Sequence, residues 1–198
     1  MTIDTNDMLN SILSSLSRID YIKPGDIPNI PLYMDQVTTF MDAQLSASKR
    51  YESDKILTKT MINNYAKNDL LPPPTKKKYS KEHLLLLVFI YYFKNLLTIT
   101  DIQALLKPIT DKYFQDSDSL TLEDIYNEVF RLEKSQIDVL KEDISNRYHL
   151  SRETFSDAPE EDQEFLKTFS FICLLSFDVY VKKQIIEKLI DQMNPPQK

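Results

Sequence analysis

The sequence contains very little glycine and cysteine. Its 198 residues include one glycine, Gly25, and one cysteine, Cys173. Phosphate-binding loops need several glycines so that the backbone can approach the phosphates, and this excludes P-loop and dinucleotide-binding enzymes. Glycine also makes many hairpin turns, so its scarcity argues against a β-rich chain. We therefore expect an all-α protein, with Cys173 buried as an inert thiol in an apolar stretch.

The sequence also lacks an apolar run long enough to cross a membrane. The longest run, residues 84–93, spans ten residues, whereas a membrane-spanning helix needs about 20. The first ten residues carry Asp4 and Asp7 and lack the positive charge and apolar core of a signal peptide. The sequence thus predicts a cytoplasmic protein without a membrane partner.

Few residues are suited to catalysis or metal binding. The two histidines, His83 and His149, are far apart, and neither is spaced with Cys173 or with carboxylates as in a metal site or a nucleophile pair. Each is expected to be structural or solvent-facing. We expect no metal, no cofactor and no enzymatic activity.

Charge is distributed unevenly along the chain. The total is −6, from 24 basic and 30 acidic residues. Residues 55–107 nevertheless hold nine lysines against Asp69, Glu82 and Asp101, a net charge of +6, so the remainder carries −12. A basic module attracts a phosphate backbone, while an acidic remainder limits unspecific binding. This pattern favours a DNA-reading module joined to a partner or sensor domain.

Apolar periodicity predicts helices throughout the chain. The expected helices cover residues 8–21, 33–45, a short segment after 58, a longer one after 80, then 101–106 between Thr100 and Pro108, 121–147 and 165–193. The segment 121–147 could pair with another helix or with its own copy. The last helix is apolar on several faces, so we expect it to be buried in a bundle or a dimer interface.

The short helix after Thr58 has a polar face without carboxylates. Thr58 is its expected N-cap, and Ile62 and Tyr65 belong to an apolar stripe that also includes Met61 and Ala66. The polar face consists of Lys59, Thr60, Asn63, Asn64 and Lys67. Such a face could lie in the major groove, where asparagine reads adenine and lysine contacts phosphate or guanine. The alternative is an ordinary solvated helix face.

Three prolines, residues 72–74, end this helix, and a short exposed loop follows before Ser80 caps the next one. The loop carries Lys76, Lys77 and Lys78. They could contact backbone phosphates as a wing beside the helix, or they could simply keep a loop tip soluble.

The order of these features resembles the winged helix-turn-helix of the MerR regulators. Tyr65 matches the second Tyr of that family's Arg-Tyr-Tyr, Leu70 and Leu71 match its Gly-Leu-Leu turn, and Tyr79 and Ser80 match the start of its next helix. Lys77 stands where an Arg is usual. The resemblance covers about residues 57–106. The whole chain also resembles the uncharacterised bacterial family catalogued as domain of unknown function 1836.

The sequence departs from the MerR pattern at several positions. Asn63 and Asn64 replace the Arg and the first Tyr, Asp69 replaces the Gly, and the wing is reduced to a few residues. An Arg suited to gripping phosphate is therefore missing, together with much of the strand pairing that stiffens a wing.

The MerR resemblance implies a transcription regulator in three parts. These are an N-terminal helix and loop at 1–31, a DNA-binding module at 32–107 and a helical dimerisation or sensor domain at 108–198. Such a protein would bind double-stranded DNA as a homodimer, with two recognition helices on the half-sites of a palindrome, and could respond to a small-molecule effector. The alternative is a non-enzymatic adaptor that uses the same scaffold to bind another protein.

Overall fold

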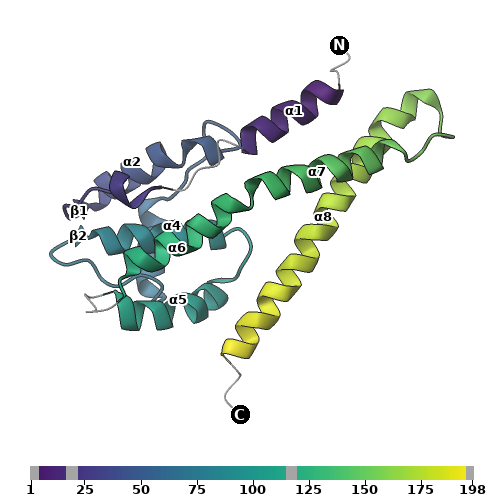
Figure 1. Ribbon diagram of the computed structural model, residues 1–198. Coiled ribbons are helices and arrows are strands. Elements are labelled where there is room, and N and C mark those ends of the chain that lie inside the picture. The colour runs from purple at the N-terminus through teal and green to yellow at the C-terminus, as the bar shows by residue number, and fades with distance from the viewer. Residues whose placement is uncertain (1–4, 17–21, 115–119, 195–198) are drawn as a thin grey trace. The chain divides into compact units, whose positions relative to one another are not determined.

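The computed structural model describes residues 5–16, 22–114 and 120–194, and these are mostly helical (Figure 1). This confirms the expected all-α class. The helices are α1 (Thr5–Leu16), α2 (Met34–Gln44), α3 (Lys59–Lys67), α4 (Lys81–Phe93), α5 (Ile99–Tyr113), α6 (Leu122–Ser135), α7 (Ile137–Arg152) and α8 (Glu160–Met193). Two short strands, β1 (Leu32–Tyr33) and β2 (Lys78–Tyr79), pair antiparallel.

The chain forms two compact units. The central unit comprises residues 20–131 and 189–198, and the hairpin unit comprises residues 1–19 and 132–188. The three-part division expected from the sequence stays a prediction. No helix in the described part of the chain is long and apolar enough to cross a membrane.

The core of the central unit is built around α4. All residues from His83 to Tyr91 are buried, so this helix is covered on every side. The Phe89 ring lies against those of Tyr126 and Phe130 on α6, with centroid distances of 5.5 and 5.6 Å. The Tyr126 hydroxyl donates a hydrogen bond of 2.6 Å to the carbonyl of Ile22. This bond satisfies a polar group that would otherwise be costly to bury.

The hairpin unit has a smaller core. Leu9 of α1, Tyr148 of α7 and Phe171 of α8 are its buried cluster. Arg152 joins the ends of α7 and α8 through two hydrogen bonds to Glu164, of 2.8 and 2.6 Å. This two-point geometry is the strongest form of an arginine–carboxylate contact.

Helix α5 extends beyond Pro108, so the predicted stop at this proline is wrong. The helix begins after Thr98, whose hydroxyl accepts a bond from the Asp101 amide, and the predicted cap Thr100 lies inside it. A proline within a helix leaves the carbonyl four residues earlier without its usual donor. Here that carbonyl belongs to Ala104, and the side-chain amide of Asn194 donates to it at 3.4 Å.

The expected helix 121–147 is two helices, because α6 ends at Ser135 and α7 begins at Ile137. The Ser135 hydroxyl donates to the Leu132 carbonyl, and the Gln136 amide bonds only three residues back, to Glu133. A serine that bonds the preceding turn competes with the regular ladder and interrupts it. The Ser135–Gln136 segment is therefore a junction between two helices.

Helix α8 starts five residues earlier than predicted, at Glu160, and its first turn carries three acidic residues that suit the helix dipole. The expected burial of Cys173 is wrong, because its side chain is exposed. Many large apolar side chains of this helix, including Phe169 and Ile172, are exposed as well, so no bundle within the described chain buries it. Its burial in a dimer interface stays a prediction. Phe171 is buried in the core of the hairpin unit and the partly buried Leu175 packs beside it, because α8 packs through one side only.

Candidate nucleic-acid interface

Helix α3 is held on the core by one face, as the sequence predicted. Thr58 caps it, with its hydroxyl accepting a 3.1 Å hydrogen bond from the Met61 amide. Ile62 and Tyr65 are buried, and burial raises the pKa of the Tyr65 hydroxyl above its ordinary value. The helix also contacts α2. Its orientation is therefore fixed by apolar burial, which leaves the opposite face to solvent.

The opposite face of α3 carries the predicted polar residues, and all five are exposed. They are Lys59, Thr60, Asn63, Asn64 and Lys67. The helix contains no carboxylate of its own, but Lys59 forms an ion pair with Asp35 at the start of α2. Both partners are largely exposed, so the pair adds little stability. It does reduce the net positive charge at the beginning of the helix.

The end of α3 explains how Asp69 can replace a glycine. Asp69 has a positive φ of 53°, the left-handed conformation that glycine usually supplies after a helix. The Leu70 amide then reaches back to the Tyr65 carbonyl at 2.9 Å, which satisfies a carbonyl that the last helical turn leaves open. Leu70 and Leu71 are each only 1% exposed. The two leucines thus anchor the turn in the core.

The lysines after the three prolines lie in a tight turn, residues 75–78, which we call the basic turn. The Lys78 amide donates to the Thr75 carbonyl at 3.0 Å, and Lys76 and Lys77 have positive φ values of 51° and 65°. Two such residues in succession define the hairpin-type turn that suits a twisted strand pair. Lys76 and Lys77 are exposed at its tip.

The strand pair fixes the basic turn to the rest of the central unit. Tyr33 pairs with Lys78, and Leu32 pairs with the buried Tyr79. Lys78 is half-buried, and its ammonium group lies 5.0 Å from the centre of the Tyr33 ring. Helix α2 contacts α3, β1 and β2. One helix therefore supports both predicted elements of the interface.

His83 is a structural residue, one of the two roles expected for it. Its Nδ1 accepts a 3.0 Å hydrogen bond from the Ser80 amide, so it completes the cap of α4. Burial lowers the pKa of the imidazole below its ordinary value, and the nearby carbonyls of Pro72 and Pro73 oppose this shift. Among the described residues, Nε2 has no well-aligned hydrogen-bond partner.

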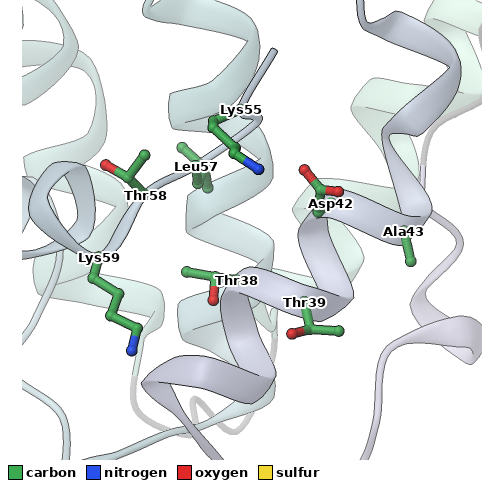
Figure 2. A pocket seen from close by; sticks show the side chains of 8 residues that line it. All are labelled: Thr38, Thr39, Asp42, Ala43, Lys55, Leu57, Thr58 and Lys59. Atoms are coloured by element: carbon green, nitrogen blue, oxygen red, sulfur yellow. The ribbon is translucent and has the colours of Figure 1, made fainter. Parts of the chain in front are cut away.

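An open groove of about 470 Å³ lies between α2 and the segment that leads into α3 (Figure 2). Its lining includes Asp42, Lys55 and Lys59, and Figure 2 shows the Lys55 side chain pointing toward Asp42. A 2.8 Å hydrogen bond from Lys49 is the main reason why the pKa of Asp42 is lowered. This groove could not be predicted from sequence pattern, because its lining comes from two separate segments.

The lining of this groove contains no histidine and no cysteine. In the described residues as a whole, no three histidine, cysteine or acidic side chains gather as a metal site would need. The groove can accommodate a polar group beside Lys55, Lys59 and the Asp42 carboxylate.

The family model for a domain of unknown function, DUF1836, matches residues 22–129. The chain belongs to the DUF1836 family. The match covers more than half of the chain and includes both strands and helices α2 to α5. No curated protein and no solved structure matches this chain. The DUF1836 region therefore coincides with the part of the central unit that carries α3 and the basic turn.

Proposed function

We propose that this DUF1836 protein is a transcription regulator that binds duplex DNA through a MerR-like winged helix-turn-helix. The observation that carries the proposal is the exposed face of α3, which presents lysine and asparagine side chains without a carboxylate of its own. In this proposal, α2 and α3 are the two helices of the motif. Helix α3 enters the major groove, and the basic turn acts as the wing.

The residues that carry the MerR resemblance have the burial that this motif would require. Tyr65 and Tyr79 are buried, as are both leucines of the turn after α3. Asp69 takes the left-handed conformation of the glycine it replaces. The short strand pair gives the basic turn a rigid base. These features support the motif despite the missing Arg.

The exposed side chains divide naturally between two tasks. Asn63 and Asn64 can each hydrogen-bond to adenine, and a good bidentate contact contributes about 1–3 kcal/mol of base discrimination. Lys67, Lys76 and Lys77 form no ion pair within the described residues and are available for phosphates. A homodimer would place two such surfaces on a palindromic site.

The first experiment measures DNA affinity against salt concentration for the triple variant Lys76→Ala, Lys77→Ala, Lys78→Ala. Each lost phosphate contact lowers the steepness of the log–log salt dependence by about 0.9. The matched control replaces three exposed lysines elsewhere, Lys112, Lys134 and Lys188, and so changes the net charge equally. A slope that changes as much in the control as in the triple variant would remove the wing from the proposal.

The second experiment selects sites from a random duplex library with the wild type and with Asn63→Ala, Asn64→Ala. Enrichment of a palindrome by the wild type, and loss of an adenine preference in the variant, would support base reading by α3. The variant should keep its affinity for unselected DNA, because its lysines are intact.

A protein-interaction adaptor is the second candidate. The Lys59–Asp35 ion pair favours it, because a carboxylate interrupts the positive surface at the start of α3. The overall charge of −6 favours it as well. Weak library binding without an enriched site would support this candidate over DNA binding.

A further inference from the structure

Helix α8 carries an exposed stripe that runs along most of the hairpin unit. We define the stripe by residues 162, 165, 169, 172, 173, 176, 180 and 183. These positions recur at helical spacing and so share one face of the helix. Phe165 is 70% exposed and Tyr180 is 60% exposed. Phe171 and Leu175 lie on the other side, where they pack with residues of α1 and α7.

The middle of the stripe has no charge nearby. Residues 168–177 include no acidic or basic side chain on any side of the helix. Phe169 and Ile172 are both more than half exposed, and the rings of Phe165 and Phe169 stack with centroids 6.3 Å apart. Contiguous apolar surface of this kind is uncommon on a monomer and usually marks a contact with a partner.

The stripe has the same spacing in both directions from a midpoint between residues 172 and 173. Pairing residues at equal distances from this midpoint matches large side chains with smaller or polar ones and an acid with a base. The matched pairs are Ile172 with Cys173, Phe169 with Ser176, Phe165 with Tyr180, and Asp162 with Lys183. The stripe therefore complements a reversed copy of itself.

We propose that a second copy of this chain packs antiparallel on the stripe, around a twofold axis that passes between residues 172 and 173. In such a symmetric pair each position meets its matched position on the other copy. The Phe169 ring then fills the space above the small side chain of the partner's Ser176. The contact extends over about 32 Å of helix at 1.5 Å per residue.

Charge selects this arrangement over a parallel one. The antiparallel pair places Asp162 opposite the partner's Lys183 at both ends of the contact, where the half-buried Lys183 also forms a 3.4 Å ion pair with Glu187 of its own helix. A parallel symmetric pair would place each residue beside its own copy, so acid would face acid and base would face base. It would also leave a gap between the two Ser176 side chains. Like charges and unfilled space both disfavour that alternative.

This proposal deepens the proposed function, because it names the dimer interface of the proposed regulator. It rests on that function only for what the dimer would do, not for whether the dimer forms. The stripe lies within the hairpin unit, whereas α3 and the basic turn lie in the central unit. Self-association can therefore be measured on the full chain without DNA. A dimer that fails to bind DNA contradicts the proposed function alone, and a monomer that binds DNA contradicts this interface alone.

The decisive test is charge reversal with rescue, measured by sedimentation equilibrium. Asp162→Lys and Lys183→Asp are each expected to raise the dimer dissociation constant about tenfold, since two attractive pairs become repulsive. The double variant, and an equimolar mixture of the two single variants, should regain wild-type association. A monomeric wild type at micromolar concentrations, or single variants that associate like the wild type, would overturn the proposal.

A second variant tests the apolar centre of the interface. Phe169→Glu should abolish the dimer, because it places two charges in a dry contact. The control Val139→Glu adds the same charge at a similarly exposed position on α7 and should leave the dimer intact. Circular dichroism verifies that both variants keep their helix content. Equal weakening by both variants would place the contact elsewhere and overturn the stripe.

A disulfide between the Cys173 residues of two chains would test the register of the proposed pair. In an antiparallel pair with ordinary helix separation, both Cys173 residues lie beside the twofold axis on the same side of the contact. Diamide should therefore join two wild-type chains through a disulfide, with the oxidant itself reduced. Phe169→Glu should prevent this reaction. An oxidised wild type that stays monomeric, or cross-linking that Phe169→Glu leaves unchanged, would exclude the register.

Discussion

Helices α4 and α8 are both apolar on several sides, yet α4 is buried and most of the apolar surface of α8 is exposed. In α4 nine successive residues are buried, covered by α5, α6 and the strand pair. In α8 most large apolar side chains from Phe165 to Met193 are exposed, and Phe171 and Ile190 are the buried exceptions. The difference teaches that apolar character alone does not place a helix in a core. The number of neighbouring elements decides it.

The same contrast applies to the two units as wholes. The central unit combines strands, loops and several helices around one core. The hairpin unit relies on a small cluster and on ion pairs such as Arg147 with Asp178. Marginal burial is typical of a segment that gains stability from association.

The largest expected effect is a loss of stability, compared between a leucine-to-alanine change at a buried position of the central unit and at an exposed position of the hairpin unit. Leu86→Ala, at a fully buried position in α4, should lower the free energy of unfolding by about 3 kcal/mol. Leu150→Ala, at a 59% exposed position in α7, should change it by no more than about 0.5 kcal/mol. Urea unfolding followed by circular dichroism measures both. Similar losses at the two positions would contradict the contrast between the units.

The central unit should also show a pH effect, through His83. The folded pKa of His83 lies below its unfolded value of about 6.5, mainly because burial disfavours the charged ring. The unfolded chain therefore binds more protons below this value. Stability should be fully present above about pH 6.5 and fall as the pH drops toward the folded pKa.

His83→Gln isolates this contribution, since glutamine at the same position keeps an acceptor for the Ser80 amide and does not titrate. The midpoint of urea unfolding between pH 5 and pH 8 should vary less in the variant than in the wild type. The carboxyl groups with lowered pKa values, such as Asp124 and Glu164, act at more acidic pH and do not interfere. An unchanged pH profile would exclude His83 as its source.

The smallest effect is expected at the end of α3. Asp69→Gly should raise the free energy of unfolding by about 1 kcal/mol, because glycine takes a positive φ without the penalty of a side chain. Asp69→Ala removes the same charge but keeps the strained conformation, so it should bring no such gain. If both variants raise the free energy of unfolding equally, the charge of Asp69 and not its backbone conformation lowers the stability of this turn.

The local features of the candidate interface could be predicted from the sequence. Thr58 and Ser80 cap α3 and α4 as expected, and the polar face of α3 is exposed as its periodicity indicated. Caps and amphipathic faces depend on residues within one or two helical turns of each other. Caps and amphipathic faces can therefore be predicted from a short stretch of sequence.

Other features depended on contacts that the sequence pattern does not contain. Pro108 predicts a helix stop, but α5 passes through it, and Asn194 provides a donor from ninety residues away. The ion pair of Lys59 with Asp35 and the groove beside Asp42 likewise join separate segments. Each of these required knowing which elements meet in space.

The sequence by itself determined the helical class, the caps, the exposed polar face of α3 and the concentration of lysines around it, because these follow from local propensity and residue order. The tertiary structure alone decided which apolar helix is enclosed. Nine residues of α4 are buried because other elements surround them, whereas α8 meets its own unit on one side only. Burial of a side chain depends on the elements packed around its helix, and the sequence of that helix alone does not specify those elements.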